Sequence, residues 1–134
     1  MKISKDVAEA EFERMLEANA ILLDLPGSTK EDQDSAAQVK GRILHAMMLG
    51  SLVIDEAGQP VFTPQRGGKE GSSITFYEPT GASFMAMDLG KSGHEVSKMF
   101  HALANITRTN AKLFSSMKAA DLKVCTALAT IFLA

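Results

Sequence analysis

The chain has a single cysteine, Cys125, among its 134 residues. One thiol cannot form a disulfide within the chain, so we expect a reducing compartment. Long hydrophobic runs are also missing: the most apolar stretch, residues 122–134, is broken by Lys123, Thr126 and Thr130. It is shorter than the roughly 20 apolar residues that span a bilayer, and the charged N-terminus is unlike a signal peptide. These absences predict a cytoplasmic protein with no membrane partner.

The sequence has no surplus of positive charge either. Its formal net charge is −2 at pH 7, whereas a general nucleic-acid binder needs an excess of Lys and Arg facing phosphates. We therefore expect no nucleic-acid partner. The charge is uneven, with 12 acidic and 8 basic residues in positions 1–70 but 4 and 6 in positions 71–134. Such opposite halves could attract each other within a chain or between copies.

Catalytic and metal-binding signatures are missing as well. The three histidines, His45, His94 and His101, have no acidic or Cys partner at ligand spacing. Residues 67–69, Gly-Gly-Lys, lack the spacing of a phosphate-binding loop. Cys125 lies on the apolar stripe of a predicted helix, which favours a buried, inert thiol over a nucleophile. We expect no enzyme activity, no cofactor and no metal.

What is present is an ordinary globular composition, 46% hydrophobic and 22% charged, in a chain of single-domain length. Apolar residues at helical spacing predict helices over residues 5–23 and about 29–48. A capping box formed by Ser28 and Glu31 is expected to open the second helix, and Gly50 to end it.

The middle of the chain changes to β-favouring runs. Residues 52–54 and 61–63 predict a β-hairpin with Gly58 at positive φ, and residues 74–77 predict a third short strand. Residues 64–73, which are rich in Gly and Ser, predict a flexible loop.

From Pro79 onward the sequence predicts helices. Thr80 is expected to cap a short helix, and a Ser92–Glu95 capping box a longer one with an apolar face of Val96, Met99, Phe100 and Leu103. Residues 110–117 and 119–133 predict the last two helices. The resulting fold class is α+β, a mostly helical single domain over residues 1–134 with a small antiparallel β-hairpin or three-stranded element.

Phe84, Met85 and Met87 are the candidate protein-binding residues. Three large apolar side chains within four residues cannot all face one core on a short helix. Either some of them are exposed, where Met makes adaptable contacts, or the helix lies between two layers and is buried nearly all round.

Residues 74–133 carry an ordered series of motifs. A short strand leads into Glu-Pro-Thr-Gly-Ala at residues 78–82 and a hydrophobic turn ending in Met-Asp at 87–88. A Met-x-x-x-Leu-Ala-x-Ile-Thr helix follows at 99–107, then a short helix and a Leu-containing one joined near an Asp-Leu step. This series resembles the tail assembly chaperones of long-tailed bacteriophages. Where that family often has Gly after the Ile-Thr step, this chain has Arg108.

The resemblance implies a specific role in the cytoplasm of an infected bacterium. Such chaperones bind the tape-measure protein and help tail-tube subunits assemble around it, are absent from the mature virion, and often exist in two lengths through a ribosomal frameshift. The chain looks like the short form. Self-association into rings or spirals would fit heterologous contacts.

Two other functions stay open. One is a structural phage tail or head–tail connector protein, which would be found in purified particles. The other is a small enzyme or ligand-binding protein, which would need a pocket with convergent polar groups and a perturbed titratable residue.

Overall fold

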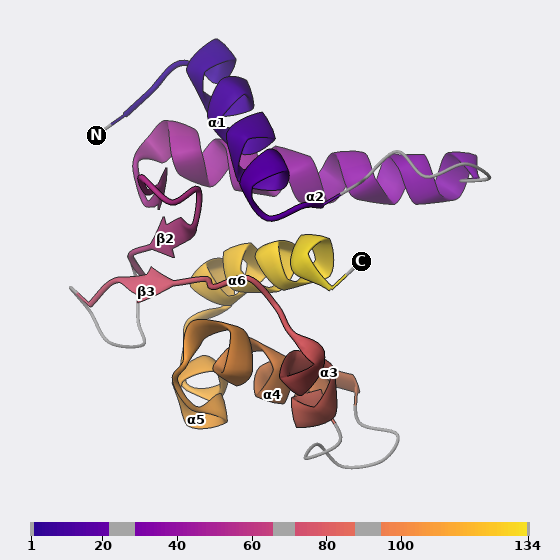
Figure 1. Cartoon of the computed structure of the whole chain (residues 1–134). Coiled ribbons are helices and arrows are strands. Elements are labelled where there is room, and N and C mark those ends of the chain that lie inside the picture. The colour runs from indigo at the N-terminus through magenta and orange to yellow at the C-terminus, as the bar shows by residue number, and fades with distance from the viewer. Residues whose placement is uncertain (1, 22–28, 66–71, 88–94, 134) are drawn as a thin grey trace.

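The computed structural model describes residues 2–21, 29–65, 72–87 and 95–133 (Figure 1). These residues form six helices and one three-stranded antiparallel sheet of order β1-β2-β3. In chain order the elements are α1 (Lys5–Ala18), α2 (Lys30–Leu49), β1 (Leu52–Ile54), β2 (Pro60–Phe62), β3 (Ile74–Thr75), α3 (Gly81–Met87), α4 (Glu95–Thr107), α5 (Ala111–Ser115) and α6 (Ala119–Phe132). The predicted fold class, a mostly helical α+β single domain, is confirmed.

Within the described ranges, no helix combines the length and the apolar character needed to cross a bilayer. The longest one, α2, carries an acidic first turn and is exposed along much of its length.

The first helix ends earlier than its apolar pattern predicts. α1 begins after Ser4, whose hydroxyl accepts a hydrogen bond from the Val7 N–H, and ends at Ala18. The next residue, Asn19, is buried, and its Nδ2 donates to the carbonyls of Met15 (2.8 Å) and Gly58 (3.1 Å). This long-range contact diverts the chain out of the helix, so the predicted helix over 5–23 is wrong at its C-terminal end. Residues 22 and 23 lie outside the described ranges.

A capping box opens the second helix one residue later than predicted. The Thr29 hydroxyl accepts from the Asp32 N–H (3.1 Å), and the Asp32 carboxylate accepts from the Thr29 N–H (3.2 Å). Asp at this position can replace the Glu of the usual pattern because its carboxylate also reaches the cap N–H. Gly50 ends α2 with φ 86°, the left-handed conformation expected of a glycine C-cap.

The β-hairpin forms where the sequence predicts it. Leu52 pairs with Phe62 and Ile54 with Pro60, while β3 pairs antiparallel with β2. Gly58 has φ 82°, as predicted for the turn. The third strand is shorter than predicted, covering only residues 74–75.

The predicted loop over 64–73 lies partly outside the described ranges, at 66–71. At its two ends, Pro64 is buried and the hydroxyls of Thr63 and Ser73 lie 2.9 Å apart. Both ends are thus joined to the folded domain.

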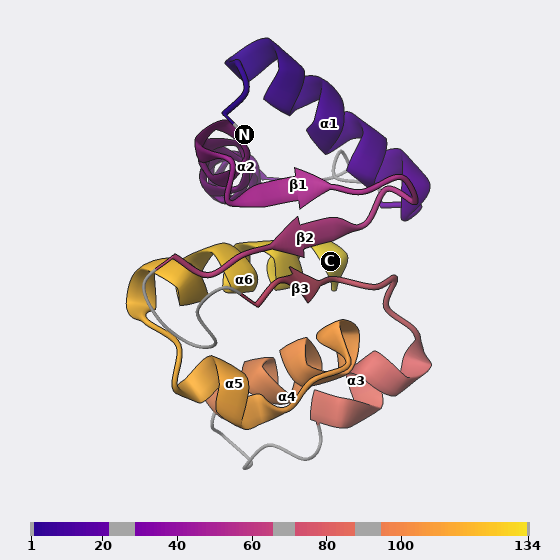
Figure 2. The ribbon, with the colours of Figure 1, turned by 90° about the vertical axis from the view of Figure 1, so that its left-hand side faces the viewer.

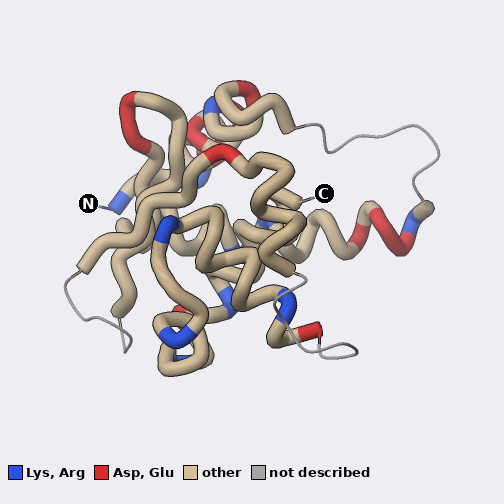
Figure 3. The backbone as a smooth tube through the Cα atoms, turned by 60° about the horizontal axis from the view of Figure 1, so that its bottom comes forward, with Lys and Arg blue, Asp and Glu red and all other residues tan. Residues whose placement is uncertain are grey.

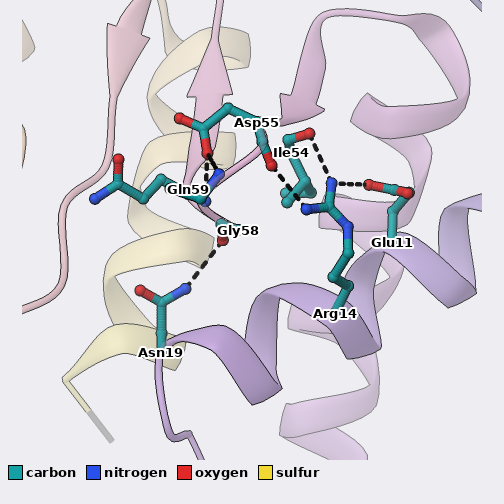
Figure 4. A network of polar contacts seen from close by, with 8 residues as sticks. Glu11, Arg14, Asn19, Ile54, Asp55, Gly58 and Gln59 are labelled. Atoms are coloured by element: carbon teal, nitrogen blue, oxygen red, sulfur yellow. Dashed lines mark hydrogen bonds and ion pairs between the residues drawn. The ribbon is translucent and has the colours of Figure 1, made fainter.

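Arg14 of α1 contacts the backbone of the hairpin through its guanidinium (Figure 4). Its guanidinium donates to the carbonyl oxygens of Ile54 (2.8 Å) and Asp55 (2.7 Å) and to the Glu11 carboxylate (2.6 Å). The Asp55 carboxylate in turn accepts from the N–H of Gln59 (2.9 Å), which closes the turn. The Ile54 carbonyl at the end of β1 is therefore satisfied by a side chain instead of a further strand.

The core is organised around α6, with α1, α2 and the sheet on one side and α3, α4 and α5 on the other (Figure 2). Phe76, which follows β3, is fully buried and meets the ring of Phe132 edge-on, with centroids 6.4 Å apart. The predicted apolar stripe of the last helix is confirmed: Cys125, Leu128 and Phe132 are buried.

The predicted face of α4 is only partly correct. Leu103 is buried and Met99 and Phe100 are half-buried, but Val96 is 65% exposed. The buried residues of α4 all lie in its second half, from Ala102 onward, so its first turn extends past the core. Ser92 of the predicted capping box lies outside the described ranges.

Candidate functional site

The short helix α3 carries the three candidate binding residues and is set by the turn that follows β3. The Thr80 hydroxyl accepts from the Ala82 N–H (3.2 Å), which caps the first turn as predicted. The Thr80 N–H donates to Ser83 Oγ (3.1 Å). The helix then packs along α4 (Figure 2).

The buried residue of α3 is polar. Ser83 is the one buried position of this helix, 1% exposed, and its hydroxyl donates to Asn105 Oδ1 of α4 at 2.7 Å. The large apolar side chains lie on other faces: Phe84 is 53% and Met85 72% exposed. An amphipathic helix of a soluble domain normally has the opposite arrangement. Of the two arrangements that the sequence left open, the exposed one is found.

Met87 lies at the edge of this exposed surface and is half-buried. We call Phe84, Met85 and Met87 the α3 apolar face. The helix itself, Gly-Ala-Ser-Phe-Met-Ala-Met, has no charged residue. Charges gather elsewhere, for example in Glu31 and Asp32 at the exposed start of α2 (Figure 3). The face is thus both apolar and uncharged.

The end of α4 holds the start of α3 in place. The Tyr77 N–H donates to the Ile106 carbonyl (3.0 Å), and the Arg108 guanidinium lies 3.9 Å from the centre of the Tyr77 ring. Arg108 has φ 55°, the left-handed conformation that Gly adopts without strain. The cation–π contact offsets part of the roughly 1–2 kcal/mol that a side chain costs there. Arg108 therefore keeps a turn geometry that Gly would favour.

A groove of about 840 Å³ between α2 and α6 was not predicted from the sequence. Its walls include Arg42 and His45 of α2 and Lys123 of α6, and Phe62 of β2 lines it as well. The buried Asp121 carboxylate at its edge accepts from the Gln65 N–H (3.0 Å). The helices that form the groove are far apart in the sequence, so neither helix alone indicates it.

Cys125 has the environment of a structural thiol. It is fully buried, and its Sγ donates to Met117 Sδ at 3.7 Å. Burial, and secondarily the charge of Asp121, raises the pKa of Cys125 to about 12. The thiol is thus protonated at neutral pH and a poor nucleophile.

The remaining titratable candidates do not converge. His45 is exposed and His101 half-buried, and His94 lies outside the described ranges. Among the residues that the structure describes, no three His, Cys, Asp or Glu side chains are grouped to hold a metal ion.

Comparisons with protein-family models, with curated proteins and with solved structures found no match to this chain.

Proposed function

We propose that this protein is a phage tail assembly chaperone. It binds the tape-measure protein in the cytoplasm of the infected bacterium, helps tail-tube subunits assemble around it, and leaves before the virion matures. The observation that carries the proposal is the amphipathicity of α3, which is the reverse of the usual one. Its buried side chain is Ser83, and its large apolar side chains Phe84 and Met85 are exposed to solvent.

The chemistry of this face suits the proposed client. A long helical tape-measure protein exposes apolar surface before the tube encloses it, and such surface promotes aggregation. Met side chains adapt to irregular apolar partners, and an amphipathic client helix can lie against an apolar surface through its own apolar stripe. The absence of charge from α3 avoids the cost of burying an unpaired ion under the client.

The size of the face predicts weak binding per copy. Full burial of a Phe or Met side chain contributes roughly 1.5–3 kcal/mol, and Phe84 and Met85 have about half to three-quarters of their surface left to bury. Together they supply roughly 2–4 kcal/mol, which is no more than the cost of immobilising a partner. Retention would then need many copies on one client, and tube subunits could displace each copy in turn.

Other features support a binding role over catalysis. The thiol of Cys125 is buried with a raised pKa, and the groove between α2 and α6 combines solvent-exposed basic side chains with apolar ones. Neither this thiol nor the described side chains of the groove form an activated nucleophile.

Co-expression with the tape-measure protein of the same genome tests the proposal. The client should be soluble with the wild-type chain, and should precipitate with a variant in which Phe84, Met85 and Met87 are all changed to Ser. Val7→Ser is the matched control, since Val7 is also a half-exposed apolar helix residue but lies on α1 at the opposite end of the molecule (Figure 1). Equal client solubility with and without the wild-type chain would refute the proposal.

Composition of purified particles separates the chaperone from a structural tail or connector protein. A chaperone is present in infected-cell lysates but missing from mature particles. Stoichiometric amounts of the chain in particles would contradict the proposal, even if the client is made soluble.

A further inference from the structure

The groove between α2 and α6 has a mixed cationic and apolar lining. On α2 its wall follows one helical stripe, Gln38, Arg42, His45 and Leu49, at spacings of three and four residues. Leu49 is 54% exposed although it is a large apolar residue. The opposite wall includes Lys123 and the half-buried Val124 of α6. A partner in this groove would meet basic side chains and apolar surface together.

The two cations of the groove are not neutralised within the described part of the chain. Arg42 and Lys123 are exposed, and neither side chain makes a hydrogen bond, ion pair or ring contact there. The carboxylate in the lining, Asp121, is 3% exposed and already accepts from the Gln65 N–H. Among the described residues the lining therefore carries more positive than negative charge, on a protein whose net charge is −2.

Gly41 leaves room for a partner on the α2 wall of the groove. It lies inside α2 with no need for positive φ, and a Cβ built on it would meet no atom within 4 Å. Gly in a helix interior is less stable than Ala, and no contact with the described residues requires Gly here. Gly at such a position permits close approach of another backbone. Because Gly41 also lines the groove, the approaching chain would lie in the groove.

We propose that the groove between α2 and α6 binds an acidic amphipathic helix of a partner protein. Its acidic residues would pair with Arg42 and Lys123, its apolar residues would cover Leu49 and Val124, and its backbone would pass close to Gly41. This surface is separate from the α3 apolar face and does not depend on the proposed function. A nucleic acid is less suited because the apolar lining would leave its phosphates partly unpaired.

The test uses the full-length, ¹⁵N-labelled protein and two blocked helical peptides of about 18 residues, long enough for several turns. One peptide has Leu along one face and Glu on the others, and its counterpart replaces each Glu by Lys. The acidic peptide should shift the amide resonances of α2 and α6 residues around the groove, while the basic peptide should leave them unchanged. Equal shifts from both peptides, shifts confined to other surfaces, or no shift at millimolar peptide would overturn the proposal.

Variants separate binding from folding. The double variant Arg42→Glu with Lys123→Glu should lower the affinity for the acidic peptide by about tenfold or more. The control Lys5→Glu with Lys112→Glu changes the net charge equally at exposed sites outside the groove and should leave this affinity unchanged. Gly41→Ala should raise the melting temperature by a few degrees. It should also lower the affinity for the acidic peptide, because the added Cβ occupies the space that the peptide backbone would enter. A Gly41→Ala variant with undiminished affinity would refute the close approach. If an oligothymidylate binds more tightly than the acidic peptide and shifts the same resonances, the groove binds a nucleic acid and the proposal is overturned.

Discussion

Gly58→Ala should strongly destabilise the domain because two costs coincide at this residue. The φ of Gly58 is +82°, where an L side chain is strained. A Cβ there would also lie 2.3 Å from the Cβ of Ala18, the last residue of α1, whereas the next nearest atoms are at an ordinary 3.8 Å. The Ala18 methyl is attached directly to the helix backbone, so it cannot rotate away.

The magnitude follows from adding these costs. The left-handed conformation costs a non-glycine residue about 1–2 kcal/mol, and overpacking against a fixed methyl costs a further 1–3 kcal/mol or so. Gly58→Ala should therefore lower the free energy of unfolding by roughly 2–5 kcal/mol, a large part of the 5–15 kcal/mol typical of a domain. Ala18→Gly, at a helix end, should cost only about 0.5–1 kcal/mol.

A double-mutant cycle measured by urea denaturation isolates the steric part. Removing the Ala18 methyl clears the 2.3 Å contact, so Ala18→Gly with Gly58→Ala should be more stable than additivity predicts by about 1–3 kcal/mol. If the two effects add to within about 0.5 kcal/mol, the described approach of the hairpin turn to the end of α1 is wrong.

Three further predictions concern other parts of the domain. Arg14→Ala should lower the free energy of unfolding, measured by urea denaturation, by about 2–3 kcal/mol because two carbonyls lose a charged donor. Glu11→Gln should lower it by under about 1 kcal/mol because that ion pair is partly exposed. Equal losses would contradict the role given to the Arg14 hydrogen bonds. The folded thiol of Cys125, with its pKa raised to about 12 from 9.0, keeps its proton longer than the unfolded thiol, so stability should fall as pH rises through this interval. Cys125→Ala should remove that part of the slope in pH-dependent denaturation, and identical slopes would refute the burial argument. Changing Phe84 and Met85 to Ser should alter the free energy of unfolding by less than about 1 kcal/mol by the same method, because both side chains are mainly exposed; a larger loss would make them core residues.

Features that depend on local chemistry could be predicted from the sequence. Gly50 and Gly58 mark the end of α2 and the hairpin turn because a positive φ is needed there and Gly adopts it without strain. The apolar stripe around Leu128 predicts the central helix because a long segment repeats one face. The end of α1 could not be predicted, because it depends on a hydrogen bond from Asn19 to Gly58, far along the chain.

The candidate site shows the same division. The crowding of Phe84, Met85 and Met87 indicates that something unusual occurs in this segment. Which side of the helix is buried depends on the hydrogen bond between Ser83 and Asn105, two residues on different helices. A Ser in an apolar helix gives no sign of this partner, so the exposure of the face required the structure. The groove could not be predicted for the same reason, because its cations come from α2 and α6, which are far apart in the sequence.

Hydrogen–deuterium exchange of the complex with the tape-measure protein tests the central claim most directly. Amides of α3, a single short helix with one buried residue, should exchange quickly in the free chain and slow markedly when the client covers Phe84 and Met85. Slowed exchange at residues 81–87 that disappears in the variant with Ser at Phe84, Met85 and Met87 is the predicted result. A stable complex in which α3 exchanges as fast as in the free protein would contradict it.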